Sequence, residues 1–278
     1  MCEHDHHAND AYDDPNLDRG LAYDLDAWQT QQRTLRDRRA VLGLMGAGAA
    51  VAGGAVLLGT TGSAAAAVAE IPAETAGPYP GDGSNGPDVL LESGIVRRDI
   101  RSSIGSASGT AAGFPFKMVF TLVNAATEKP VSGLALYAWH CTRDGKYSMY
   151  SSGVEDQNYL RGVQVSNTKG KVRFTSIFPA CYDGRWPHVH FEVYRNVSEA
   201  TSSGTILATS QMALPRAECA AVYSSQSGYS ASTTNLNRVS ISSDGVFGDD
   251  DGVRQIATMR GSVAKGFYKA KLRVPVDL

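Results

Sequence analysis

Hydrophobic and polar residues alternate in five short stretches after residue 115 of the chain. These stretches cover residues 116–124, 133–139, 172–177, 189–194 and 266–274. Alternation with a period of two is typical of β-strands, whose successive side chains face opposite sides of a sheet. Turn-forming residues separate the stretches. The pattern therefore predicts an all-β fold with a single β-sandwich domain and long loops.

The segments outside these strands have different compositions. Residues 70–83 are rich in glycine and proline, which favours an extended N-terminal arm that wraps the domain. Residues 215–223 have helical periodicity and begin with a proline, so a short helix is expected there. The stretch 224–243 is rich in serine and threonine and is interpreted as a surface loop.

Residues 1–69 are typical of an acidic tail followed by an export signal. The pair Arg38-Arg39 precedes an apolar run that extends to Leu58, and small residues follow at 63–69. This order of charge, apolar stretch and small residues indicates a twin-arginine-type signal and an exported bacterial protein. The alternative is an apolar run retained as a membrane anchor. The catalytic domain is then expected at residues 70–278.

Charge excludes one class of function. The chain has 278 residues, 42% of them hydrophobic, and a formal net charge of -2. Of its 28 acidic and 26 basic residues, 9 and 5 lie in residues 1–69, so 19 and 21 remain and the expected domain carries only +2. A strongly basic nucleic-acid binder is not indicated.

Three cysteines follow the signal segment. They are Cys141, Cys181 and Cys219. Outside the cytoplasm one disulfide is reasonable, and an odd count leaves one thiol free. The sequence does not fix the pairing. We favour Cys181 with Cys219, because that bridge would tie the segment before His188 to a later one, and we expect Cys141 to be buried in a strand.

Two histidines and two tyrosines are candidate metal ligands. His188 and His190 are separated by one residue, so both point to the same side if they lie on a strand. Tyr182 precedes them, and Tyr147 lies in a turn-like sequence, Asp144-Gly-Lys-Tyr-Ser. A phenolate is an anionic oxygen donor suited to a trivalent ion, so this set suggests Fe(III). The alternatives are two buried, hydrogen-bonded imidazoles and an ordinary aromatic residue at a turn.

Several motifs taken together resemble the intradiol ring-cleavage dioxygenases, with the closest likeness to their secreted branch. The motifs are Glu74-Thr-Ala-Gly-Pro-Tyr79, Trp139-His-Cys, Asp144-Gly-Lys-Tyr-Ser148, Leu160-Arg-Gly-Val-Gln-Val, Phe174-Thr-Ser-Ile-Phe-Pro179, Tyr182-Asp-Gly-Arg-Trp-Pro-His-Val-His-Phe191 and Asp244-Gly-Val-Phe247. The resemblance covers the chain from Glu70 to its end. It implies a non-haem Fe(III) held by Tyr147, Tyr182, His188 and His190, with Tyr182 and His190 as the axial pair.

The same resemblance implies a reaction and a set of substrate contacts. A catechol-type aromatic and O2 would react so that the ring opens between its two hydroxyl-bearing carbons to give a muconate-type product. Tyr182 would act as ligand and base, and Arg185 would stabilise charge on the ring. Gln211 and Tyr79 would contact the substrate. Simpler interpretations are a surface ion pair for Arg185, a solvated strand position for Gln211 and aromatic packing for Tyr79.

Two further functions compete with this interpretation. The first is a non-catalytic secreted sandwich, a binding module with a degenerate metal site. The second is a zinc hydrolase built on the histidine pair, for which Asp183 is the nearest carboxylate. His140 is interpreted as a structural residue or a support for the ligands. No nucleic-acid partner is expected, membrane contact is expected only through an uncleaved export segment, and the sequence is compatible with a homo-oligomer.

Overall fold

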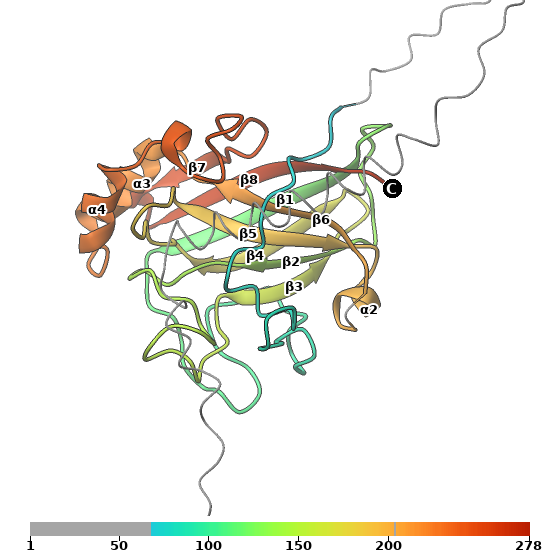
Figure 1. Ribbon diagram of the computed structural model, residues 1–278, viewed down its shortest axis with the longest axis horizontal. Helices are drawn as coiled ribbons and strands as arrows, with labels where there is room; N and C mark the ends of the chain where they lie inside the picture. The colour runs from blue at the N-terminus through green and yellow to red at the C-terminus, as the bar shows by residue number, and fades with distance from the viewer. Residues whose placement is uncertain (1–67, 203) are drawn as a thin grey trace, which may run out of the picture.

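Two four-stranded sheets face each other in the computed structural model, which describes residues 68–202 and 204–278 (Figure 1). One sheet has the strand order β4-β1-β8-β7 and the other β3-β2-β5-β6. The bounds of the first sheet are β4 Lys171–Ile177, β1 Pro115–Asn124, β8 Phe267–Val276 and β7 Thr258–Ser262. Those of the second are β3 Arg161–Val165, β2 Ala135–Trp139, β5 His188–Tyr194 and β6 Ile206–Ala213. The predicted all-β sandwich is confirmed.

The alternating pattern of β1 and β5 explains how the sheets pack. On β1, Phe116, Met118 and Phe120 are fully buried, whereas Lys117 between them is exposed. On β5 the residues of one face, which include Phe191, enter the same core. Phe120 and Phe191 contact each other across the two sheets with ring centroids 5.2 Å apart. This apolar layer fixes β5, and β5 carries both candidate histidine ligands.

The N-terminal arm runs along the edge of both sheets. The backbone N–H of Ile71 donates to the carbonyl of Pro275 on β8, and that of Glu74 donates to Thr209 on β6. Further on, the Pro80 carbonyl accepts hydrogen bonds from Tyr137 Oη at 2.7 Å and Arg161 Nη1 at 2.8 Å. The predicted extended arm is confirmed. It covers the face of β2 that looks away from the main core.

Helices α3 and α4 lie together at one end of the sandwich, and α2 lies apart from them, toward the other end (Figure 1). The predicted helix is α3, Arg216–Ser225, with Pro215 at its N-cap. The stretch expected to be a loop contains α4, Ser230–Leu236, and the 3-10 helix η1, Ile241–Ser243, so that part of the prediction is wrong. The remaining short elements are α2, Val197–Ala200, and η2, Val263–Lys265.

The three described cysteines are free thiols, so the favoured pairing of Cys181 with Cys219 is wrong. All three are buried, as expected for Cys141. Two of the thiols contact backbone carbonyls in the packed interior instead of forming a bridge. Cys141 contacts the carbonyl of Ala180, and Cys181 contacts that of Arg185. Burial raises the pKa of the Cys141 and Cys181 thiols to about 12, so both are protonated at neutral pH.

The acidic tail and the export signal, residues 1–67 of the predicted N-terminal segment, lie outside the described residues. Within the described ranges, no helix has the length and apolar character needed to cross a membrane.

Candidate metal centre

His188 and His190 open strand β5 and face the same side of the sheet. Their ring centroids are 4.7 Å apart, and each side chain is 2% exposed. The backbone carbonyl of Trp186 accepts a hydrogen bond from His188 Nδ1. Because Nδ1 carries the proton, Nε2 of His188 holds a lone pair and points toward the candidate site.

The two tyrosines reach the histidines from loops. Tyr147 follows a turn in which Gly145 has φ +89°, a left-handed conformation that favours glycine. Tyr182 lies in the loop before β5 and is half-buried, whereas Tyr147 is buried. The two phenol rings meet edge to face with centroids 6.0 Å apart. Residues distant in sequence therefore converge beside the start of β5.

Three donor atoms surround His188 Nε2 within hydrogen-bonding distance. His188 Nε2 is 3.0 Å from His190 Nε2, 3.4 Å from Tyr147 Oη and 3.3 Å from Tyr182 Oη. Tyr147 Oη is 3.1 Å from His190 Nε2. The single lone pair of a neutral imidazole nitrogen cannot accept three hydrogen bonds. Hydrogen bonding alone therefore does not explain why three polar atoms surround His188 Nε2.

These separations fit a shared metal ion. Ligand bonds of about 2.0–2.1 Å place neighbouring ligand atoms about 2.9–3.4 Å apart at the usual coordination angles. Among the described residues, no group of three or more His, Cys, Asp or Glu side chains could hold a metal, so a metal here depends on the tyrosines. A set of two phenol oxygens and two imidazole nitrogens suits a hard, highly charged ion.

The site keeps both imidazoles neutral. Burial, together with the positive charge of Arg185, lowers the pKa of His188 to about 3. Burial, followed by the neighbouring His188, also lowers the pKa of His190 well below its usual value. Neutral imidazole is the form that binds metals, so no proton competes with an ion at neutral pH.

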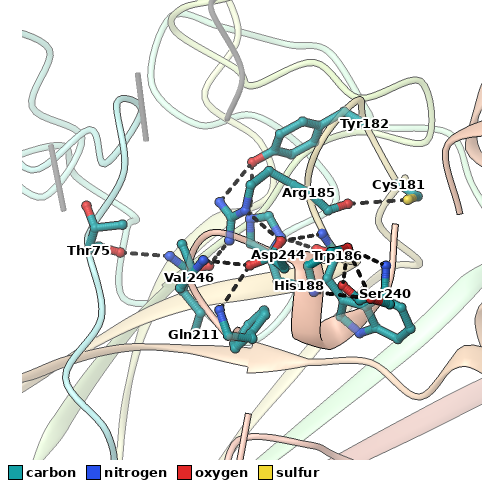
Figure 2. A network of polar contacts seen from close by, with 12 residues as sticks. Thr75, Cys181, Tyr182, Arg185, Trp186, His188, Gln211, Ser240, Asp244 and Val246 are labelled. Atoms are coloured by element: carbon teal, nitrogen blue, oxygen red, sulfur yellow. Dashed lines mark hydrogen bonds and ion pairs between the residues drawn. The ribbon is translucent and has the colours of Figure 1, made fainter. Parts of the chain in front are cut away.

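Arg185, Gln211 and Asp244 form a buried network beside Tyr182 (Figure 2). Arg185 Nη2 donates to Gln211 Oε1 at 2.6 Å, and Arg185 Nε donates to Asp244 Oδ2 at 3.0 Å. Arg185 Nη1 lies 3.5 Å from Tyr182 Oη. Gln211 Nε2 in turn donates to the carbonyl of Thr75 on the arm. The simpler interpretations, a surface ion pair for Arg185 and a solvated Gln211, are therefore wrong.

Tyr79 on the arm also joins the site. Its ring lies 4.9 Å from that of Tyr147 and 5.3 Å from that of Tyr150. The contact places the arm against one candidate ligand, and it is equally the aromatic packing that the sequence allowed. A substrate contact for Tyr79 stays a prediction.

His140 bonds to groups other than the four donor atoms, and Asp183 faces solvent. His140 is buried, with Nδ1 at 2.7 Å from the Cys141 carbonyl and Nε2 at 2.7 Å from Ser176 Oγ, which supports its structural role. Asp183 is exposed, so it gives no support to the zinc-hydrolase alternative.

Sequence reasoning missed Asp244 and Trp139 as parts of the site. Asp244 was visible only as the first residue of a short motif, and Trp139 only as the residue before His140. Trp139 stacks on His190, and within the described residues the indole Nε1 and His190 Nδ1 are buried without a hydrogen-bond partner. Knowledge of how β2 and β5 pair would have identified these two residues as neighbours, because Trp139 lies directly opposite His190.

Comparisons with known proteins give a fold and one short sequence match. No family model matches this chain. The chlorocatechol 1,2-dioxygenase of Rhodococcus opacus is 41% identical over 54 residues, which are 19% of this chain and 21% of that protein. The match thus spans about a fifth of the length of that relative.

Two solved structures share the architecture. An intradiol ring-cleavage dioxygenase from Tetranychus urticae superposes with a TM-score of 0.55 and 22% identity, over 67% of this chain and 89% of that one. A second dioxygenase structure gives a TM-score of 0.54 and 23% identity, over 67% of this chain and 88% of that one. At these identities the likeness establishes the fold.

Proposed function

We propose that this chain, which has the fold of the intradiol ring-cleavage dioxygenases, is an exported non-haem Fe(III) enzyme. It would open a catechol-type ring between the two hydroxylated carbons. Both atoms of O2 would enter the product as carboxyl oxygens, so catechol and O2 together account for a muconate. The carrying observation is that Tyr147, Tyr182 and His190 each place a donor atom 3.0–3.4 Å from His188 Nε2.

The chemistry of the donor set supports a ferric ion. Two phenolate oxygens offset much of the charge of Fe(III), and the neutral imidazoles complete a mixed oxygen and nitrogen set. When bound, Fe(III) would act as a Lewis acid that binds the catechol oxygens and favours their ionised form. The protein's own contribution is to hold the donors, to accept protons and to position the ring.

Tyr182 is suited to receive a proton from the incoming catechol. It is half-buried, whereas Tyr147, His188 and His190 are buried, so Tyr182 is the donor with room to move. Arg185 Nη1 lies 3.5 Å from its oxygen and favours the phenolate form until the proton arrives. The same fixed positive charge would stabilise negative charge that develops on the ring.

Gln211 and Tyr79 are proposed to line the substrate site. Gln211 is fixed at both ends, by Arg185 and by the carbonyl of Thr75, so its side chain presents one orientation. Export rests on the Arg38-Arg39 signal pattern outside the described residues. A twin-arginine route moves folded proteins, which suits an enzyme that binds its metal before export.

Oxygen uptake tests this function. Purified protein loaded with Fe(III) should consume one O2 for each catechol, with muconate identified by mass spectrometry and both labelled oxygens recovered from 18O2. Zinc-loaded protein serves as the control and should consume none. Iron-loaded protein that consumes no catechol from a panel of substituted catechols would favour the binding-module alternative.

A further inference from the structure

We infer that Asp244 is a positioning residue that fixes the Arg185 guanidinium between Tyr182 and Gln211. The inference rests on the proposed function and assigns a role to a residue outside the proposed ligand and substrate-contact set. Figure 2 shows the arrangement, with Arg185 at the centre of the network and Asp244 on its Nε side.

Three different nitrogens of Arg185 meet three different partners. Nε faces Asp244 Oδ2 at 3.0 Å, Nη2 faces Gln211 Oε1 at 2.6 Å, and Nη1 faces Tyr182 Oη at 3.5 Å. A guanidinium is planar and its donors are fixed relative to one another. The contact at Nε therefore sets the direction in which the two Nη groups point.

Asp244 is itself held rigidly. Its Oδ1 accepts the backbone N–H groups of Val246 at 2.9 Å and Phe247 at 3.0 Å. Its Oδ2 accepts the N–H of Trp186 at 2.6 Å as well as Arg185 Nε. Four donors on one carboxylate leave its side chain little rotational freedom. The backbone at Trp186 and at Val246 and Phe247 therefore sets the position of the Arg185 guanidinium.

Burial makes the orientation of Arg185 depend on its ion pair with Asp244. Both side chains are 0% exposed, so water cannot replace a lost partner. Removing one charge of a buried pair leaves the other uncompensated, which is strongly unfavourable. Arg185 would then either turn toward another acceptor or retain its place with its charge unbalanced beside Tyr182 and His188.

Asp244→Asn tests the role, because asparagine has nearly the same shape and its oxygen can still accept the N–H groups of Val246 and Phe247. In the iron-loaded variant kcat should fall at least tenfold, with KM changed less than threefold. Asp244→Glu restores the charge and should recover part of kcat. Asp99→Asn is the matched control, since Asp99 and Arg101 form an exposed pair at 2.7 Å, and it should behave as the parent.

A second readout needs neither iron nor activity. In the metal-free parent, the Nε–H NMR signal of Arg185 should be dispersed and exchange slowly with water, whereas that of Arg101 should exchange fast. Asp244→Asn should abolish the protection of Arg185. Fast exchange of Arg185 in the parent, or parental kcat and exchange in a folded Asp244→Asn, overturns the proposal. If the parent cleaves no catechol, the proposed function fails, and the exchange measurement still decides the positioning role.

A different observation supports a second inference, on the outer face of the sheet β4-β1-β8-β7. The four strands contain seven basic residues and no acidic residue: Lys117, Lys171, Arg173, Arg260, Lys269, Lys271 and Arg273. All seven point away from the core, and each is exposed or half-buried. A domain with nearly balanced charge has thus gathered cations on one sheet face, here called the basic face.

The basic face extends in two dimensions. Strand register places Lys117 opposite Lys269, and Lys269 opposite Arg260, so one row of cations crosses three strands. Along β8, cations recur at Lys269, Lys271 and Arg273, at a spacing of about 7 Å for alternate residues. Arg273 is paired with the exposed Glu128 at 2.8 Å, so the other six carry the charge of the face. Cations spread across several strands suit a planar anionic surface better than a single linear chain.

A shallow cavity of about 260 Å³ lies at the edge of this face. Arg254, Lys271 and Arg273 line it together with Val68, the first described residue, and Pro275. The chain therefore enters the domain beside the basic face. We propose that this face docks onto anionic phospholipid bilayers, which attract clustered basic side chains by charge complementarity.

Vesicle sedimentation of the full chain tests this docking. Binding to phosphatidylcholine vesicles that contain phosphatidylglycerol should be strong and weaken as salt rises. Lys269→Gln with Lys271→Gln should lower the partition coefficient roughly tenfold or more. The control pair Arg195→Gln with Arg238→Gln, exposed residues outside this sheet, should change it little.

Three outcomes would overturn the docking proposal. They are no binding, equal binding to neutral vesicles in every variant, and displacement by heparin with no preference for anionic vesicles. Equal binding would assign any membrane contact to the apolar run before residue 58. Displacement by heparin would assign the basic face to a soluble polyanion.

Discussion

The indole ring of Trp139 lies parallel to the imidazole of His190, with 5.0 Å between ring centroids and 6° between ring planes. The two residues are direct neighbours on β2 and β5, so the sheet itself imposes the stack. The stack holds a candidate ligand whose Nδ1 finds no hydrogen-bond partner within the described residues. On its Nδ1 side, the orientation of this imidazole therefore depends on ring packing rather than on a hydrogen bond.

Replacing Trp139 should weaken both the fold and iron retention. Trp139→Leu removes the stacked ring and leaves a cavity, so the free energy of unfolding should fall by about 3 kcal/mol. Trp139→Phe keeps an aromatic surface and should retain iron better. Urea unfolding of metal-free protein and competition with a chelator measure the two effects. Equal iron affinity in the leucine and phenylalanine variants would contradict the positioning role of the stack.

Each of the two candidate tyrosine ligands should contribute to a visible absorption band of the iron-loaded protein. Iron-loaded protein should absorb visible light through charge transfer from phenolate to Fe(III), and Tyr147→Phe or Tyr182→Phe should weaken and shift this band. Tyr150→Phe is the matched control, because Tyr150 is also buried near the site but binds the Gly81 N–H through its oxygen. An unchanged spectrum in both ligand variants would refute the assignment.

Glu74 should make the folded state less stable as the pH rises. Burial raises the pKa of its carboxyl from 4.5 to about 8. Between these values the folded protein keeps a proton that the unfolded chain releases, so the free energy of unfolding falls with rising pH and levels off above about 8. Glu74→Gln should remove up to about 5 kcal/mol of this dependence.

Denaturant unfolding at several pH values measures the difference between the Glu74→Gln variant and the parent. Glu92→Gln, at an exposed position, is the control. Parallel stability curves for the Glu74→Gln variant and the parent would show that Glu74 titrates normally in the folded protein.

The three described cysteines should be unreactive toward thiol reagents in the native protein. Their thiols are buried and unbridged, so a thiol reagent should modify none of them before unfolding. After unfolding of the full chain without reductant, the reagent should modify four thiols, because Cys2 reacts together with these three. A deficit of two thiols under these conditions would restore the disulfide between Cys181 and Cys219.

The strands with regular alternation could be predicted from the sequence, and others could not. β1, β2, β4, β5 and β8 follow the predicted ranges to within two residues. β6 was missed because Ser210 and Gln211 make it look polar, yet both are buried by segments far away in sequence. Burial by distant chain is invisible to local pattern.

Helix α4 was missed for a related reason. Its sequence, Ser-Ala-Ser-Thr-Thr-Asn-Leu, is made largely of weak helix formers. Tertiary contacts stabilise it, because Ser232 Oγ accepts the Cys181 N–H and Asn235 Nδ2 donates to the Cys181 carbonyl. The four candidate ligands were reached from spacing and resemblance, whereas the role of Asp244 required the three-dimensional network.

The pairing of the first and last strands has a consequence for biosynthesis. β1 lies parallel to β8, and the arm before β1 bonds to Pro275 near the end of the chain. A ribosome synthesises β8 after every other described strand, so β1 waits for this partner. The sheet β4-β1-β8-β7 can therefore be completed only after β8 has emerged, so the packed core behind β5 and its two histidines is finished late in synthesis.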